Sequence, residues 1–184
     1  MPRWTPDGLK PIRKVSLAGV ASYSFNAAQG LDLTNYRRFV FELEGVLTTT
    51  DVGNVWVRTS GDSGSTDYDV AGQLWAAAST FTSNLNSGAG AAQIRLTPGD
   101  LGSVDANELG ISGTVSLVHG GSALAEPCLE FDVQFRTPSA VAFYVAGMAY
   151  RKSTSQITSV DFLTADGANF EKGEISIYGV RRIA

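Results

Sequence analysis

Hydrophobic and polar residues alternate along much of this chain with a period of two, which is the spacing of a half-buried β-strand. In RFVFEL the residues Phe39, Phe41 and Leu43 fall on one face. The stretch LEFDVQF, at 129–135, alternates even more regularly, with acidic or amide residues between its apolar ones. The same spacing predicts further strands at 55–58, 93–96, 111–118, 142–150, 159–163 and 174–180.

Turn-forming residues separate these segments. Gly, Asn, Asp and Pro gather in SGDSGSTD, NSGAGA, TPGDLGS, VHGGSA and TADGANFEKG. The Ala-rich stretch 70–81 is the best helical candidate, for a turn or two, and 98–109 offers another short turn. About eight to ten short strands in one chain predict an all-β fold, an antiparallel β-sandwich of jelly-roll type with short helical turns at most.

The length of 184 residues suits one domain with a sizeable core. We therefore expect a single β-sandwich domain over residues 12–184. Residues 1–11 contain Trp4 and three prolines and are expected to form an N-terminal arm, with Trp4 as a docking residue.

The segment ITSVDFLTADGANFEKGEISIYGVRRI, at 157–183, has the pattern of a hairpin. Its second strand is predicted to lie between earlier strands and to close the fold. Ile175 and Ile177, with Val180 as a further candidate, would then fill the core, while Ser176 and Tyr178 face the other way.

Charge and composition exclude several classes of protein. The net charge is −4, and the basic clusters do not exceed pairs in sequence, which argues against nucleic-acid binding. No apolar stretch is long enough for a transmembrane helix, so no membrane role is expected. The first residues lack the apolar segment of a secretory signal, which predicts synthesis in the cytoplasm, and the single Cys128 excludes an internal disulfide.

The Gly-rich segment 60–69 suggests two kinds of chemistry. GDSGS resembles the nucleophile segment of trypsin-like serine proteases, but no histidine precedes Ser63, and the single His119 lies downstream. Asp62, Asp67 and Asp69 are possible calcium ligands, although their spacing differs from that of an EF-hand loop. A hairpin turn explains both patterns, so no catalytic residue, metal or cofactor is predicted.

Acidic residues at outward strand positions leave a glycan-cleaving enzyme open as a lesser alternative. Glu42, Glu44, Glu130 and Asp132 are such residues, and two suitably spaced carboxylates are what glycoside hydrolysis requires. A solvated sheet face produces the same alternation, and the sequence does not give the distances between these groups.

Aromatic residues near turns suggest a glycan-binding site. Tyr23, Tyr68 and Trp75 lie in or near turn-rich segments, where an exposed ring stacks on a sugar. Trp56 lies inside a strand pattern and is expected in the core.

The order of segments resembles that of a family of tailed-bacteriophage virion proteins with jelly-roll-like sandwiches. The resemblance rests on YRRFVFELEGVLTTTDVGNVWVRTSGDSGSTDYDV, then ISGTVSLVHG, and finally ITSVDFLTADGANFEKGEISIYGV, and it extends over residues 31–180. The chain departs from the family at VHGG and at the Ala-rich stretch around Trp75.

This resemblance implies a non-enzymatic structural component of a phage particle, in a tail, fibre, spike or capsid decoration. Its expected location is the virion. Its expected partners are copies of itself, which form a trimer by analogy, and other virion proteins. A glycan on the host surface is a further expected partner. The alternative function is a carbohydrate-binding module that uses the loop aromatics.

Overall fold

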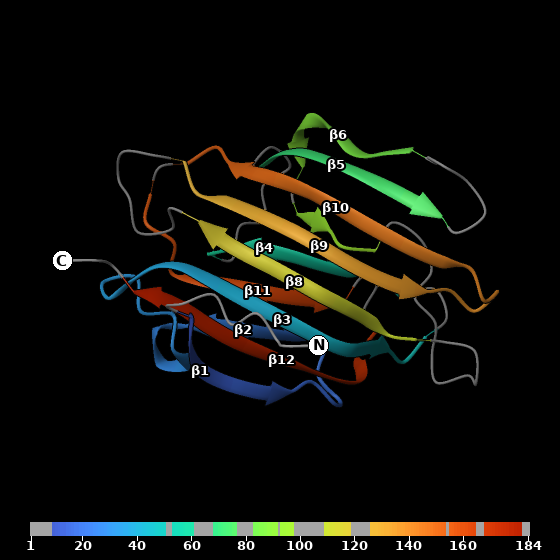
Figure 1. The fold of residues 1–184 in the computed structure, drawn as a ribbon, viewed down its shortest axis with the longest axis horizontal. Helices are drawn as coiled ribbons and strands as arrows, with labels where there is room; N and C mark the ends of the chain where they lie inside the picture. Colours follow the sequence, from blue (N-terminus) through green and yellow to red (C-terminus); the bar gives the residue numbers. More distant parts are fainter. Residues whose placement is uncertain are drawn as a thin grey trace.

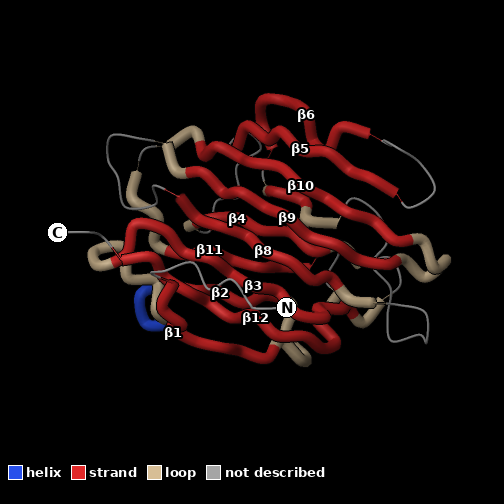
Figure 2. The backbone as a smooth tube through the Cα atoms, in the orientation of Figure 1, coloured by secondary structure: helices blue, strands red, loops and turns tan. Residues whose placement is uncertain are grey.

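In a computed structural model of the chain, two β-sheets pack face to face as a sandwich (Figure 1). The structure describes residues 9–50, 53–60, 68–76, 83–91, 93–97, 109–118, 126–153, 155–164 and 168–181. Strands make up most of them, and within these ranges the helical structure is one 3₁₀ turn at Ala27–Gln29 (Figure 2).

The larger sheet has eight strands in the order β1-β12-β3-β8-β9-β10-β5-β6. Their bounds are β1 (Leu9–Ser16), β3 (Tyr36–Thr48), β5 (Tyr68–Ala76), β6 (Ser83–Ala91), β8 (Ile111–Val118), β9 (Cys128–Arg136), β10 (Ala142–Arg151) and β12 (Phe170–Arg181).

The smaller sheet has four strands in the order β2-β11-β4-β7. They are β2 (Ser22–Asn26), β4 (Val55–Thr59), β7 (Ile94–Arg95) and β11 (Ser159–Thr164). All pairings in both sheets are antiparallel, which confirms the predicted antiparallel β-sandwich.

Aromatic rings from both layers form the centre of the core. Phe41 comes from β3 of the large sheet, and its ring centroid lies 5.2 Å from that of Phe25 on β2 and 5.5 Å from that of Phe162 on β11. All three side chains are fully buried. Because the apolar residues of each strand alternate with polar ones, one face of each sheet supplies this core and the other face points outward.

Strand β12 lies between β1 and β3, so the last described strand is an interior strand of the large sheet (Figure 1). Ile175 and Ile177 have no exposed surface. Gly179 is buried and follows Ile175 and Ile177 on the inward side of the strand. Tyr178 and Val180 therefore occupy outward positions, and Val180 is half-buried there. The expectation that Val180 fills the core was therefore wrong.

Two local expectations differ from the structure. Residues 70–76 of the supposed helix belong to strand β5, since Val70 and Leu74 alternate into the core and the strand pairs with neighbours on both sides. Residues 77–81 and 98–108 lie outside the described residues. Trp56 is not a core residue: it projects from the outward side of β4, where the guanidinium carbon of Arg95 lies 5.9 Å from its ring centroid.

The expected N-terminal arm overlaps strand β1. Leu9, Lys10 and Pro11 pair with Val180, Gly179 and Tyr178 of β12. Residues 1–8, including Trp4, lie outside the described residues.

Candidate functional site

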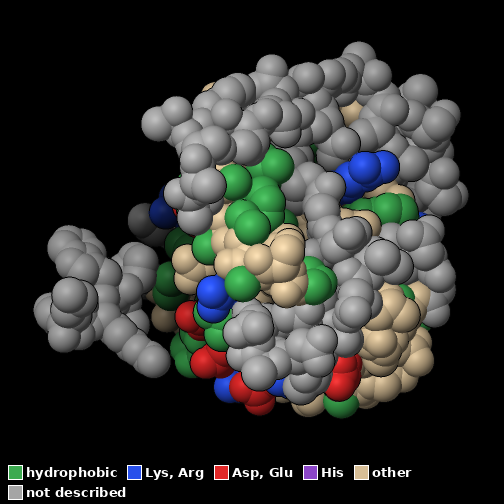
Figure 3. Space-filling model, turned by 90° about the vertical axis from the view of Figure 1, so that its right-hand side faces the viewer, with side chains coloured by type: hydrophobic (Ala, Val, Ile, Leu, Met, Phe, Trp, Pro, Cys, Tyr) green, Lys and Arg blue, Asp and Glu red, His purple; other side chains and the backbone are tan. Residues whose placement is uncertain are grey.

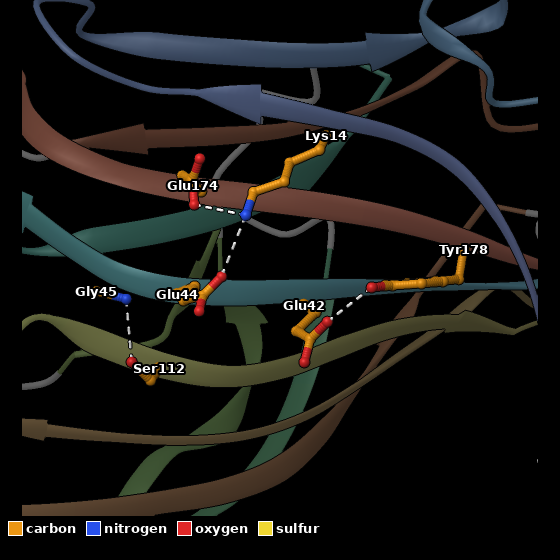
Figure 4. Close-up of polar contacts among 7 residues, drawn as sticks. All are labelled: Lys14, Glu42, Glu44, Gly45, Ser112, Glu174 and Tyr178. Carbon is orange, nitrogen blue, oxygen red and sulfur yellow. Dashed lines mark hydrogen bonds and ion pairs between the residues drawn. The ribbon is translucent and has the colours of Figure 1, made fainter. Parts of the chain in front are cut away.

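The outward face of the large sheet has a charged half, formed by β1, β12, β3 and β8. Lys14 Nζ lies 2.6 Å from Glu174 Oε2 and 3.4 Å from Glu44 Oε2, and the Tyr178 hydroxyl donates to Glu42 Oε2 at 2.9 Å (Figure 4). The hydrogen bonds and nearby charges of the two carboxylates raise the pKa of Lys14. Acidic and basic side chains also gather toward the lower, β1 and β12 side in the view from the end (Figure 3).

A break in the β3–β8 register adds a polar contact to this half. The register shifts between Leu43 and Val46, and Gly45 takes a positive φ of 61°. The Gly45 backbone N–H donates to the Ser112 hydroxyl at 3.1 Å, so the bulge leaves this N–H satisfied (Figure 4). Because these polar groups already satisfy one another, this half resembles an ordinary solvated sheet face.

The ion pair between Arg38 and Glu130 marks the border of the charged half. Arg38 Nη2 on β3 lies 3.0 Å from Glu130 Oε2 on β9 and donates to the hydroxyl of Ser116 at 3.1 Å. Beyond this pair, toward β10 and β5, the character of the outward face changes.

Strand β10 presents large apolar side chains to solvent. Tyr144, Met148 and Tyr150 occupy outward positions and are 39%, 41% and 45% exposed. Trp75 lies directly opposite Tyr144, on the neighbouring strand β5. Together with Trp75, these three residues of β10 form one largely apolar surface. Exposed apolar side chains gathered on one surface mark a binding site more often than scattered ones do.

The Tyr144 ring is held from two sides. Its centroid lies 5.1 Å from that of Trp75, with 38° between the ring planes. Its hydroxyl donates to Asp132 Oδ2 on β9 at 2.7 Å. This hydrogen bond, with smaller effects of partial burial and of the carboxylate charge, raises the pKa of Tyr144. The two rings and the carboxylate thus form one preorganised unit across three strands.

A shallow groove of about 670 Å³ crosses β5, β9 and β10 beside this unit. It is hollow because the outward residues Ala71 and Ala146 carry only methyl groups, whereas Trp75 and Met148 are larger. The groove is lined by Ala71, Gly72, Gln73, Trp75, Glu130, Phe131, Ala146, Gly147 and Met148.

Gly147 permits the close packing beneath the groove. A Cβ atom at this position would lie 2.5 Å from the carbonyl oxygen of Ala71 and 2.6 Å from the Phe131 ring. Both distances are shorter than van der Waals contact, so a side chain here would force β5 and β10 apart. The absence of a side chain at Gly147 therefore helps to set the shape of the groove.

The three aromatic residues proposed from the sequence do not meet at one site. Trp75 lines the groove. Tyr68 is fully buried on the core side of β5, where its hydroxyl accepts from the Thr59 N–H at 2.6 Å, so it is not available to a ligand. Tyr23 lies on β2 of the small sheet, half-buried against the core, and its hydroxyl donates to Gln29 Oε1 at 3.1 Å.

Sequence reasoning missed the tyrosines and the methionine of β10. The available signal was that AFYVAGMAYR is apolar on both faces: Val145 and Ala149 point into the core, while Tyr144, Met148 and Tyr150 point outward. A sheet that is solvated on one side normally alternates apolar with polar residues, so two apolar faces on one strand indicate an outward surface with a partner.

The residues considered for enzymatic or metal chemistry have other surroundings. Asp62, Ser63, Asp67 and His119 lie outside the described residues, and Asp69 Oδ1 pairs with Lys152 Nζ at 2.9 Å. Within the described part of the chain, no three His, Cys, Asp or Glu residues are grouped so as to hold a metal ion. The carboxylates of Glu42, Glu44, Glu130 and Asp132 each contact a cation or a tyrosine hydroxyl.

Comparison with known proteins identifies no relative: no family model, curated protein or solved structure matches this chain. Over the described residues, no helix has the length and apolar character that crossing a bilayer would need.

Proposed function

We propose that this chain is a non-enzymatic carbohydrate-binding β-sandwich, and that a glycan lies in the groove against Trp75. The observation that carries the proposal is a half-buried tryptophan at the rim of an open groove with polar side chains beside it. A sugar ring has an apolar face of C–H groups and an edge of hydroxyls, so it matches an aromatic ring and polar groups together.

The polar groups around the groove suit sugar hydroxyls. Gln73 offers an amide that both donates and accepts, and Glu130 and Asp132 offer acceptor oxygens. All three are exposed at outward strand positions. Since Glu130 also pairs with Arg38 and Asp132 accepts from Tyr144, both carboxylates are fixed in place, which favours a binding role over a change of protonation during catalysis.

A virion is the proposed setting. This part of the proposal is supported by the resemblance of the segment order to tailed-phage virion proteins, and it includes a symmetric oligomer, a trimer by analogy, that contacts the host surface. We also propose a jelly-roll connectivity, which is supported by the way in which the chain passes repeatedly between the two sheets. A glycan-binding groove would serve such a particle in host attachment.

Binding to bacterial surface polysaccharides and to a panel of plant and microbial polysaccharides tests the carbohydrate proposal. The wild-type chain should be retained by at least one of them, and Trp75→Ala should not. Tyr178→Ala is the matched control, because it removes an aromatic ring from the charged half of the same face. Equal retention of the wild-type chain and the Trp75→Ala variant would contradict the proposal.

Detection of the protein in purified phage particles tests the virion setting separately. Mass spectrometry of the particles should find it in a fixed ratio to the other structural proteins. Its absence from particles would remove the virion setting and leave carbohydrate binding untouched.

A further inference from the structure

We propose that the ligand is an extended, uncharged oligosaccharide that runs along β10 from Trp75 to Tyr150. This inference rests on the proposed carbohydrate binding and adds the length, the direction and the charge of the ligand. It follows from the spacing of the outward side chains on β10 and from the charges beside them.

The aromatic residues of this outward surface lie at two separated positions. Tyr144 and Trp75 form one, and Tyr150, opposite Asp69 of β5, forms the other. Tyr150 follows Tyr144 by six positions along the strand, which corresponds to roughly 20 Å. A single sugar ring does not reach both positions, whereas a chain of several sugars does.

Between the two positions, the outward side of β10 carries one small and one larger apolar side chain. Ala146 and Met148 are the outward residues of β10 there, and their partners on β5 are Gln73 and Ala71. The groove covers this stretch, and Tyr150 stands one outward position beyond Met148. A linear glycan parallel to β10 would contact a ring at each end and lie over Ala146 and Met148 between them.

The charges along this path disfavour an acidic sugar. Glu130 lines the groove and Asp132 anchors Tyr144. Among the described residues, the cations beside the path are already paired, Arg38 with Glu130 at 3.0 Å and Lys152 with Asp69 at 2.9 Å. A carboxylate on the ligand would therefore meet like charge without a released cation to offset it, while uncharged hydroxyls would meet acceptors.

Isothermal titration with glucose, mannose and galactose oligosaccharides of one to six residues tests the length. We expect affinity to rise roughly tenfold or more between the monosaccharide and the tetrasaccharide of the bound series. Tyr150→Ala should remove this gain and leave the affinity for the shortest bound sugar unchanged, whereas Tyr150→Phe should keep the gain. Trp75→Ala should weaken binding at every length.

The outcomes separate this inference from the function on which it rests. If a neutral polysaccharide binds but length and Tyr150→Ala have no effect, the extended site is wrong and carbohydrate binding stands. If oligogalacturonates bind more tightly than the neutral series, the charge assignment is wrong. If no oligosaccharide or polysaccharide binds, neutral or acidic, the proposed function fails together with the inference.

Discussion

Tyr144 and Trp75 lie directly opposite each other on β10 and β5, with their ring centroids 5.1 Å apart. On the β9 side of Tyr144, its hydroxyl donates a hydrogen bond to the Asp132 carboxylate. Because each ring is held by a neighbour, little side-chain entropy remains to be lost when a ligand stacks on them. The pair therefore offers a preorganised platform, and its loss should affect binding more than folding.

Replacing Trp75 with alanine should reduce glycan affinity by about 2 kcal/mol or more, since central aromatic residues dominate binding energy. The free energy of unfolding should change far less, because Trp75 lies on the outward side of β5 and leaves the core intact. Titration calorimetry and urea unfolding measure the two quantities on the same variant. A loss of binding that merely follows a loss of folded protein would count against the assigned role.

Asp132→Asn should lower the pKa of Tyr144 toward its ordinary value of 10.0. In the wild-type protein the hydroxyl donates to a carboxylate, so the neutral tyrosine is favoured and its pKa is raised. The stabilisation from this contact is thus complete below pH 10 and is lost as the pH rises through the raised pKa. Ultraviolet titration of tyrosinate, with Tyr144→Phe to assign the signal, measures the shift. An unchanged titration in Asp132→Asn would show that the contact is absent in solution.

The period of two predicted the strands but not their neighbours. Phe41 and the stretch 129–135 alternate clearly, so their inward faces could be read from the sequence. The site could not, because Trp75 and Tyr144 meet only through the pairing of β5 with β10, and pairing between distant segments leaves no mark in a single sequence.

The Ala-rich stretch was misread for a related reason. Alanine favours helix as an isolated preference, but Ala71 lies in a strand paired on both sides, and tertiary pairing outweighs a weak local preference. In the sequence, Ala71 suggested a helix and Ala146 gave no signal. In the structure, the small side chains of both residues leave room for the groove.

Tyr68→Phe should lower the free energy of unfolding by about 1–3 kcal/mol, because it deprives buried groups of Thr59 of a partner. The Tyr68 hydroxyl lies 2.6 Å from the Thr59 nitrogen and 2.9 Å from its hydroxyl, in a fully buried position. Glycan binding should not change. Tyr150→Phe, at an exposed tyrosine, is the control and should alter stability by less than about 0.5 kcal/mol. Equal effects of the two substitutions would contradict the burial of Tyr68.

Cys128 should react slowly with thiol reagents at pH 8 in the folded protein. Burial, aided by the charge of Glu130, raises the pKa of its thiol to about 11, so roughly one molecule in a thousand holds the reactive thiolate. Unfolding in denaturant should restore ordinary reactivity. Because Cys128 lies opposite Tyr150 on the outward face, Tyr150→Ala should speed the reaction in the folded state. Labelling of the native protein as fast as of the unfolded protein would refute this account.

Two N-terminal deletions separate docking from folding. If residues 1–8 with Trp4 mediate assembly, their deletion should yield a smaller oligomer of the purified protein in light scattering. It should also reduce incorporation of the protein into virions. Assembly itself can raise the melting temperature of the wild-type chain. The chain lacking residues 1–8 is therefore compared with wild-type protein diluted to monomer, and the two melting temperatures should agree.

Deletion of residues 1–11 should also lower the melting temperature of the monomer. It removes Leu9, Lys10 and Pro11, which pair with β12, and so uncovers part of the strand that holds Ile177 in the core. A chain lacking residues 1–8 that still forms the wild-type oligomer and enters particles normally would contradict docking through Trp4. Equal melting temperatures of the two deleted chains would show that the first three residues of β1 add nothing to the sheet.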